Sequence, residues 1–212
     1  MNAIESNDVF SLVRLISSLE INNVPFAQTT YHHMGATISD AILQAGLNYK
    51  SVVYPRIIGL TNRYPDYVST SDFIILFKMK PLSELLRWRN KDKLERIQEL
   101  AWFLFDHKIE NEADLANWFS VSINEGEIIN IKGIGNKTVD YLKKLSGVDS
   151  IPIDRHLFKF LEFAGVKTEK YDYANYLYTE AAKHLNIGAS NLDSMIWHYM
   201  LSRNRSEQLS FY

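Results

Sequence analysis

The sequence predicts an all-α protein, and three features indicate this fold class. Apolar residues recur at spacings of three and four along most of the chain, which is the spacing of one face of an α-helix. Serine, threonine, asparagine or aspartate precede many of these runs, as is typical of helix N-termini. No alternating apolar and polar runs joined by an Asn-Gly turn indicate a β-hairpin. We therefore expect about ten short helices joined by tight turns.

The first half of the chain contains four clear helical stripes. They run from Val9 to Ile16, from Ile38 to Ala45, from Phe73 to Phe77 and from Leu94 to Phe105. Asn7 and Asp8 are candidate caps of the first helix, and Ser69 and Thr70 of the third. Pro55 is expected in the first turn of a helix or at a kink, because proline cannot donate an internal helix hydrogen bond.

The second half continues in the same way. Helices are predicted at Leu115 to Phe119 behind the sequence NEAD, at Tyr173 to Leu185 behind Asp172, and at Leu192 to Met200 with Ser190 as cap. Two further helices flank a glycine-containing turn near residue 133, and another follows Asp154.

The composition indicates a globular protein that can bury a sizeable core. The chain has 212 residues, of which 46% are hydrophobic and 13% aromatic. It contains no cysteine, which excludes disulfide bonds, thiolate zinc sites and cysteine-held iron–sulfur clusters. No stretch reaches the roughly 18 apolar residues of a membrane-spanning helix, and the N-terminus lacks the pattern of a signal peptide. We expect a soluble, cytoplasmic protein with no membrane partner.

The net charge of −2 argues weakly against a nucleic-acid partner, but the charge is unevenly distributed. Basic residues gather in two stretches, 87–96 and 131–159, each with a net charge of +3. A face that meets phosphates would have this distribution. Ordinary solvated helix faces would have it as well, so charge alone leaves both interpretations open.

A glycine turn stands between two predicted helices at residues 125–145. EGEIINI predicts a short helix and NKTVDYLKKL a second one, with KGIG between them. Glycine permits positive φ and a close approach of the backbone to a ligand, and the N–H groups that open the second helix favour a phosphate. Such a contact would hold a nucleic-acid backbone without reading its sequence. A plain turn between packed helices is the alternative.

Asp154 precedes another predicted helix, in the stretch SIPIDRHLFKFLEFAG. An aspartate at this position is typically an N-cap, although a capping carboxylate can also take part in catalysis. The helix from about 137 to 146 rises roughly 15 Å. The seven or so residues that return from it to Asp154 can span about 23 Å. The chain is therefore long enough to bring Asp154 beside Lys137.

Lys137 lies in the first turn of the second hairpin helix. The positive end of the helix dipole disfavours a charged ammonium there, which makes the nucleophilic free amine more available. A nearby carboxylate could accept a proton or stabilise a developing cation. A lysine nucleophile with an aspartate base suits attack on a carbonyl-like or oxocarbenium carbon.

Residues 131–160, IKGIGNKTVDYLKKLSGVDSIPIDRHLFKF, resemble the helix-hairpin-helix plus Gly/Pro-Asp (HhH-GPD) signature of a DNA glycosylase superfamily. Its members include endonuclease III, the mismatch-directed adenine glycosylase and the 8-oxoguanine glycosylase/lyases. The resemblance implies that Lys137 is the Schiff-base lysine and Asp154 the required aspartate. It also implies two helical domains with a DNA-binding cleft between them. Residues 30–145 would form one domain that ends in the hairpin, and residues 1–29 with 146–212 the other.

The resemblance also implies which residues contact DNA. The hairpin would bind the backbone, and the turn after the helix at DAILQAGLNYKSVV would insert a polar side chain into the gap left by a flipped base. The implied DNA-binding residues are Lys132, Gly133, Ile134, Gly135, Asn136, Thr138, Gln44, Asn48, Arg155 and His156.

The chain departs from the signature at two positions and in its cysteine content. Ile131-Lys132 replaces the usual leucine-proline before the first glycine, and Arg155 replaces the threonine or valine often found after the aspartate. Neither change removes a catalytic group. A chain without cysteine cannot hold the iron–sulfur cluster common in endonuclease III relatives. The combination of IKGIG with IDRH, together with the C-terminal LDSMIWHYM, resembles the short, cluster-free 8-oxoguanine glycosylase/lyases.

The function implied is that of a base-excision-repair DNA N-glycosylase with lyase activity at abasic sites. Lys137 would attack C1′ of a damaged nucleotide, Asp154 would assist, and β-elimination from the Schiff base would cut the strand. The partner would be double-stranded DNA containing a damaged, oxidised base or an abasic site, bound by a monomer at the nucleoid, without metal or other cofactor. Two alternatives remain: a non-catalytic helix-hairpin-helix protein that only grips DNA, and a monofunctional glycosylase.

Overall fold

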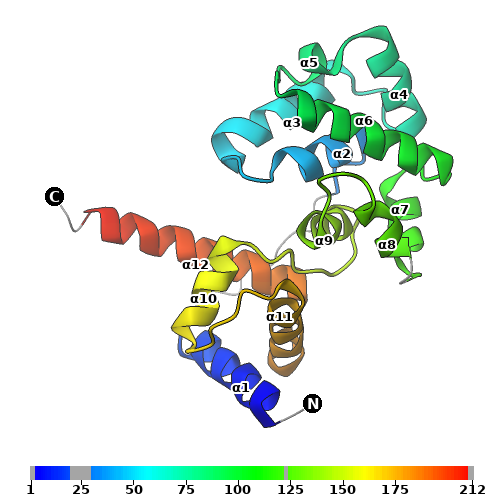
Figure 1. The fold of residues 1–212 in the computed structure, drawn as a ribbon. Coiled ribbons are helices and arrows are strands. Elements are labelled where there is room, and N and C mark those ends of the chain that lie inside the picture. Colours follow the sequence, from blue (N-terminus) through cyan, green and yellow to red (C-terminus); the bar gives the residue numbers. More distant parts are fainter. Residues whose placement is uncertain (1–2, 20–29, 122–123, 210–212) are drawn as a thin grey trace. The chain divides into compact units, whose positions relative to one another are not determined.

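A computed structural model describes residues 3–19, 30–121 and 124–209. Within these residues the chain forms twelve α-helices and one π-helical turn, η1, with no β-strand, which confirms the predicted all-α class (Figure 1). The chain divides into two compact units. We call Gln28–Val148 the central unit, and Met1–Ala27 with Asp149–Tyr212 the terminal unit.

The central unit contains eight of the α-helices and η1. They are α2 (Met34–Leu43), η1 (Tyr49–Val53), α3 (Tyr54–Arg63), α4 (Thr70–Met79), α5 (Leu82–Leu85), α6 (Lys91–Asp106), α7 (Glu112–Phe119), α8 (Asn124–Ile129) and α9 (Asn136–Leu145). Pro55 lies in the first turn of α3, as the sequence predicted. The described residues form twelve α-helices where about ten were expected, because the four-residue α5 is too short to show an apolar stripe and no stripe was assigned to α3.

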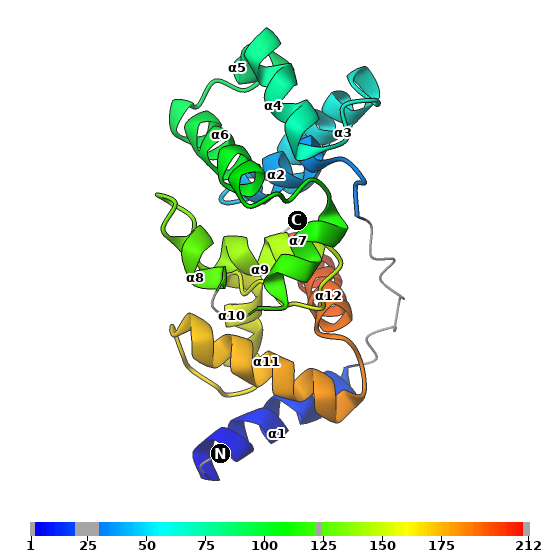
Figure 2. The ribbon, with the colours of Figure 1, turned by 90° about the vertical axis from the view of Figure 1, so that its right-hand side faces the viewer.

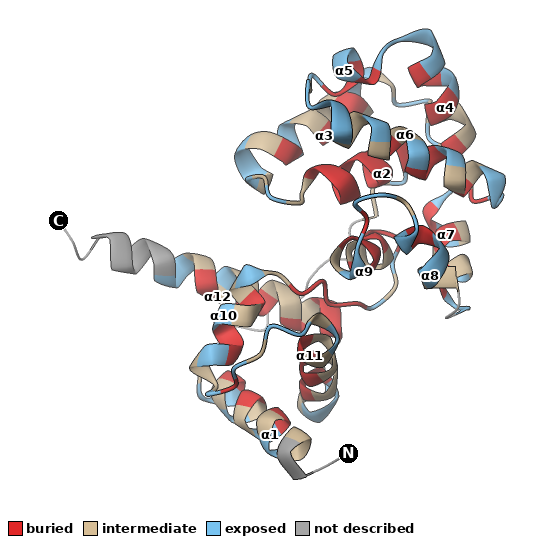
Figure 3. Cartoon of the chain, viewed as in Figure 1, coloured by how far each residue is buried: buried red, intermediate tan, exposed pale blue. Residues whose placement is uncertain are grey.

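Helix α2 is the centre of this unit. Every residue of α2 is buried (Figure 3). Helices α3, α4, α6 and α9 all pack against it, so it is covered on every side and not along one apolar stripe. Its polar residues Thr37, Ser39 and Asp40 therefore lie in the interior together with Ile38 and Ile42.

The terminal unit is built from the first helix and the last three. They are α1 (Ala3–Ser18), α10 (Arg155–Phe163), α11 (Tyr171–Leu185) and α12 (Ala189–Leu209). Helix α1 packs along α11, and α12 packs against both α10 and α11 (Figure 2). The hydroxyl of Tyr178, which is fully buried on α11, donates a hydrogen bond of 2.7 Å to the carbonyl of Leu157 and so ties α11 to α10.

The capping predictions are confirmed where the sequence carries a complete local motif. Ser69 caps α4 in a reciprocal arrangement with Asp72, and Asn111 does the same for α7 with Asp114. Each pair satisfies two backbone donors that the first helical turn leaves without an internal partner.

Other capping predictions were wrong. Helix α1 begins at Ala3, so Asn7 and Asp8 lie inside it, and Asp8 instead accepts a hydrogen bond from a tyrosine of α11. Asp172 lies inside α11, and Ser190 lies inside α12, whose first N–H groups donate to Asp149. In each case the helix begins before its apolar stripe, and packing between helices supports these additional residues.

Candidate active site and nucleic-acid interface

The predicted hairpin is present in the central unit, between α8 and α9. Its turn is closed by a hydrogen bond of 3.0 Å from the Ile134 amide to the Ile131 carbonyl. Gly133 has φ of 83°, a region where side chains other than glycine are strained. Gly135 is the N-cap of α9, in extended conformation and without a side chain to accept the first helical N–H groups. The hairpin thus presents a glycine-lined helix N-terminus, which favours an anion.

Arg96 of α6 contacts the backbone of this turn. Its Nε donates a hydrogen bond of 2.9 Å to the Lys132 carbonyl. A Cβ atom built on Gly133 would lie 2.0 Å from Nη2 of Arg96, so the guanidinium occupies the space that a side chain would need. The contact joins the two basic stretches of the sequence, 87–96 and 131–159, at one place in the fold.

Lys137 is half-buried in the first turn of α9, within this group of cations. Lys93 of α6 lies nearby, where its Nζ donates to the carbonyls of Ile42 at 2.7 Å and Ala45 at 2.9 Å. Burial lowers the pKa of Lys93, and the positive charges of Arg96 and Lys137 lower it further. Among the described residues of the central unit, no carboxylate forms an ion pair with Lys137.

Asp154 is the N-cap of α10 in the terminal unit. Its Oδ1 accepts hydrogen bonds from the amides of His156 at 2.8 Å and Leu157 at 3.1 Å. The preceding segment is fixed, because the buried Ile153 amide donates to the Tyr171 hydroxyl at 3.2 Å. The carboxylate thus lies at the positive end of a helix. Its second oxygen, Oδ2, accepts no hydrogen bond from the described residues.

Lys137 and Asp154 belong to different units, so their meeting at one carbon atom stays a prediction. The same holds for a DNA-binding cleft between the two units. Arg155, the first residue of α10, is exposed, and His156 is half-buried.

The other predicted DNA-binding residues differ in accessibility. In the hairpin, Lys132 and Asn136 are exposed, whereas Ile134 and Thr138 are buried and could offer only backbone atoms to a ligand. Gln44 is the C-cap residue of α2, and its Nε2 is buried without a hydrogen-bond partner. The exposed Asn48 caps η1 by accepting a hydrogen bond of 3.0 Å from the Ser51 amide. Insertion of Gln44 or Asn48 into DNA stays a prediction.

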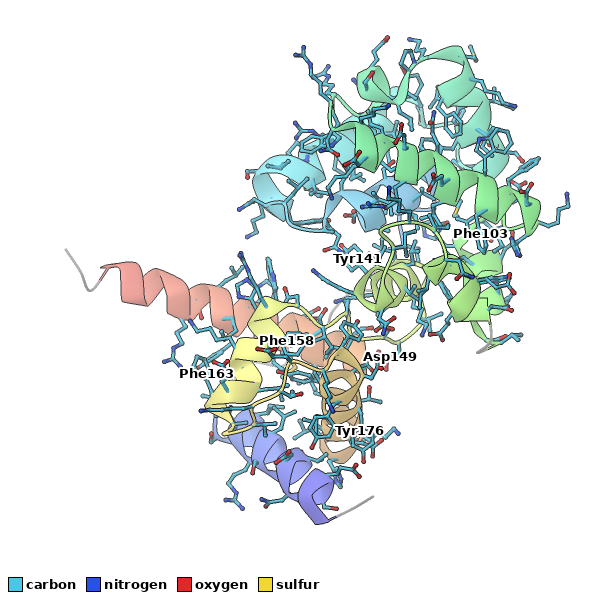
Figure 4. The ribbon with its side chains drawn as sticks, viewed as in Figure 1. Phe103, Tyr141, Asp149, Phe158, Phe163 and Tyr176 are labelled. Carbon is cyan, nitrogen blue, oxygen red and sulfur yellow. The ribbon has the colours of Figure 1, made fainter. Side chains whose placement is uncertain are left out.

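The structure adds a cluster that the sequence did not reveal: the carboxylate of Asp40 surrounded by Tyr31, Tyr49 and Tyr141. Oδ2 of Asp40 accepts hydrogen bonds from the hydroxyls of Tyr31 at 2.8 Å and Tyr141 at 3.2 Å. The hydroxyls of Tyr31 and Tyr49 are 3.0 Å apart. Figure 4 shows Tyr141 on α9, on the side that faces α2. Asp40 lies between apolar stripe positions of α2, so only the complete burial of that helix indicates its importance.

Burial dominates the electrostatics of this cluster. It raises the pKa of Asp40 from 3.8 to about 7, although the hydrogen bonds from Tyr31 and Tyr141 act in the opposite direction. Burial and the charge of Asp40 raise the pKa values of the three tyrosines, which therefore stay protonated and act as donors.

Replacing Asp40 by asparagine is expected to change the pH dependence of stability. The folded protein binds the Asp40 proton more tightly than the unfolded chain does. Protonated Asp40 therefore makes its full contribution to the free energy of unfolding below about pH 4, and this contribution is lost as the pH rises through about 7. Asparagine does not titrate, so Asp40→Asn does not lose stability in this way. The free energy of unfolding of the variant, relative to wild type, should rise by on the order of 3–4 kcal/mol between pH 4 and pH 8, measured by urea unfolding.

The matched control is Asp66→Asn, which changes an exposed carboxylate of the same unit. Its stability difference from wild type should change much less over this pH range than that of Asp40→Asn, because the side chain of Asp66 lies in solvent. A constant difference for Asp40→Asn as well would contradict the raised pKa of Asp40.

The fold and the hairpin together define a helix-hairpin-helix protein. The chain belongs to the family of the domain of unknown function DUF8548, whose model matches residues 11–201. No curated protein sequence matches the chain. In the part of the chain that the structure describes, no helix is long and apolar enough to cross a membrane.

Among solved structures, the chain is similar to the 3-methyladenine DNA glycosylase MagIII of H. pylori, whose crystal structure contains 1,N6-ethenoadenine. The TM-score is 0.64 at 14% sequence identity, and the likeness covers 94% of this chain and 98% of that one. At this level of identity the likeness shows the fold. It confirms the all-helical DNA glycosylase fold expected from the hairpin signature.

Proposed function

We propose that this protein is a DNA glycosylase of base excision repair, which removes a damaged base from double-stranded DNA and cuts the abasic site through a Schiff base on Lys137. The observation that carries the proposal is the hairpin, in which Gly133 with positive φ and Gly135 as an N-cap without a side chain lead directly into the helical turn that bears Lys137. The likeness of the fold to a DNA glycosylase over 94% of the chain supports it.

The hairpin and its cations would bind the DNA backbone. Phosphate oxygens suit the N–H groups at the start of α9 and the exposed ammonium of Lys132. Lys93 and Arg96 add positive charge beside Lys137. These contacts are indifferent to base identity and leave selection of the damaged base to a flipped-out nucleotide, since a poorly paired base costs less to extrude.

Lys137 and Asp154 would carry out the chemistry. The free amine of Lys137 attacks C1′ of the deoxyribose as the bond to the base breaks, and the Asp154 carboxylate stabilises the positive charge that develops on the sugar. The resulting Schiff base acidifies the C2′ proton, and β-elimination then cuts the strand on the 3′ side. The protein would act as a monomer in the cytoplasm, at the nucleoid.

Glycosylase activity without strand cleavage is a second candidate, favoured by the name of the structural neighbour, which mentions a glycosylase and no lyase. The damaged base is likewise open to test: the sequence resemblance favours an oxidised purine, and the neighbour's name favours an alkylated adenine.

Reduction with borohydride during incubation with damaged DNA tests these proposals. The substrates are duplexes containing 8-oxoguanine, 3-methyladenine, 1,N6-ethenoadenine or an abasic site. A covalent protein–DNA adduct on at least one of them is the result expected for the glycosylase/lyase. Base release without an adduct would support the monofunctional glycosylase. Salt-sensitive DNA binding with neither base release nor an adduct would support a non-catalytic DNA-binding protein.

A further inference from the structure

The carboxylate of Asp40 is buried in a way that a purely structural role does not explain. The residue is fully buried, and its Oδ1 has no hydrogen-bond partner. In the described part of the central unit, no cationic side chain forms an ion pair with it. A buried carboxylate without a cation destabilises a fold, and an apolar residue of similar size would pack there at lower cost. Such groups are candidates for function.

The geometry connects this carboxylate to Lys137. Tyr141, which donates to Oδ2 of Asp40, follows Lys137 by one helical turn on α9, so the two side chains leave the same face of the helix. Lys137 in turn lies near Lys93, which binds carbonyls at the C-terminal end of α2, one turn beyond Asp40. Two successive turns of α9 therefore face two successive turns of α2.

We propose that Tyr141 and Asp40 relay the proton that Lys137 must lose before it can attack DNA. This inference rests on the proposed lyase function. The ammonium of Lys137 gives a proton to the phenol oxygen of Tyr141, directly or through one water molecule, while the phenol O–H bond breaks and its proton passes to Oδ2 of Asp40. The products are a free amine, an unchanged phenol and a carboxylic acid, so protons and charge balance.

The surroundings suit this transfer. An acid with a pKa near 7 can both accept and hold a proton at neutral pH. Lys93 of α6 lies near Lys137, and the positive charges of Arg96 and Lys137 lower the pKa of Lys93 in addition to burial. The relay takes the lysine proton, which leaves the carboxylate of Asp154 free to stabilise the sugar cation.

The groups that face Asp40 can be named from each neighbouring element. The segment before α2 contributes Tyr31, η1 contributes Tyr49, and α9 contributes Tyr141. Helix α6 places Lys93 at the carbonyls of Ile42 and Ala45, at the C-terminal end of α2. Helices α3 and α4 turn buried apolar side chains toward the core of this unit, among them Ile57, Leu60, Phe73 and Leu76.

The test is the pH dependence of borohydride trapping on DNA that already contains an abasic site, so that base removal plays no part. The wild-type trapping rate should rise as the pH passes through about 7 and level off by about pH 8, because Asp40 can accept the proton only when it is ionised. Tyr141→Phe removes only the hydroxyl. Its trapping rate should fall by about 10²-fold at pH 7 and recover toward the wild-type rate near pH 9, where solvent removes the proton.

Two further variants distinguish a proton relay through Tyr141 and Asp40 from a purely electrostatic role of Asp40. Asp40→Asn should lose trapping at pH 7 in the same way, whereas a carboxylate that merely stabilised the ammonium would give faster trapping when its charge is removed. Tyr31→Phe is the matched control, because it removes the other phenol bound to the same oxygen but lies on a different element from Lys137. Its trapping rate should keep the wild-type shape of pH dependence, shifted toward higher pH, because the hydrogen bond that is lost lowers the pKa of Asp40. It should not show the fall of about 10²-fold expected of Tyr141→Phe.

The outcomes distinguish the relay from the function on which it rests. No adduct with wild-type protein would overturn the lyase and the relay together. A wild-type adduct combined with an unchanged profile for Tyr141→Phe, or with faster trapping for Asp40→Asn, would overturn the relay alone. Thermal unfolding of each variant shows that the fold is retained.

Discussion

Replacing Lys137 by alanine is expected to abolish the covalent adduct that wild-type protein forms with DNA under borohydride. The proposed Schiff base requires a primary amine, and alanine supplies none, so trapping should fall below detection on damaged and abasic DNA alike. The substitution should not disturb the fold, because Lys137 is half-buried in the first turn of α9 and alanine is an excellent helix former. Adduct formation is measured by the shift of labelled DNA on a denaturing gel.

The matched control is Lys144→Ala, which removes a lysine from the last turn of the same helix. Its adduct yield should equal that of wild type. An adduct that persists in Lys137→Ala would assign the Schiff base to another amine and remove the central residue of the proposed mechanism.

Replacing Asp154 by asparagine should slow base excision by about 10²–10³-fold in single-turnover experiments. Asparagine keeps the side-chain oxygen that accepts hydrogen bonds from the amides of His156 and Leu157, so α10 should remain capped. The negative charge is lost, and with it the stabilisation of the sugar cation. DNA binding should be unchanged, because a carboxylate contributes no attraction to phosphate.

Asp149, which is labelled in Figure 4, provides the control for a capping carboxylate without a catalytic role. It caps α12 by accepting hydrogen bonds from the amides of Ala189 at 2.9 Å and Ser190 at 2.8 Å. Asp149→Asn should excise bases at the wild-type rate. Full base-excision activity in Asp154→Asn would show that Asp154 only caps α10, and it would contradict the proposed stabilisation of the sugar cation.

Much of the local structure followed from the sequence. The helical stripes, Ser69 as the cap of α4, the proline in the first turn of α3 and the hairpin around Gly133 are as predicted. The candidate pair Lys137 and Asp154 was also identified from sequence, with the helix-terminal position of each correctly expected. Their meeting at one sugar carbon stays a prediction.

The sequence missed features that depend on distant elements. Asp8, Asp172 and Ser190 looked like caps because they precede apolar stripes, but packing extends each helix beyond its stripe. Nothing near Gly133 in the sequence indicates that Arg96 occupies the space beside it. Asp40 resembled a polar residue on the outer face of an amphipathic helix.

The amino-acid sequence by itself determined the all-α class, the glycine turn and the helix-terminal positions of the lysine and the aspartate. It could do so because helix periodicity, capping and positive φ depend on steric and hydrogen-bonding relations among residues a few positions apart. Only the tertiary structure decided that α2 is covered on every side, which places Asp40 among three tyrosines. One of them, Tyr141, follows Lys137 by one turn of α9. Burial is set by helices far away in the chain, and it is burial that raises the pKa of Asp40 toward neutrality.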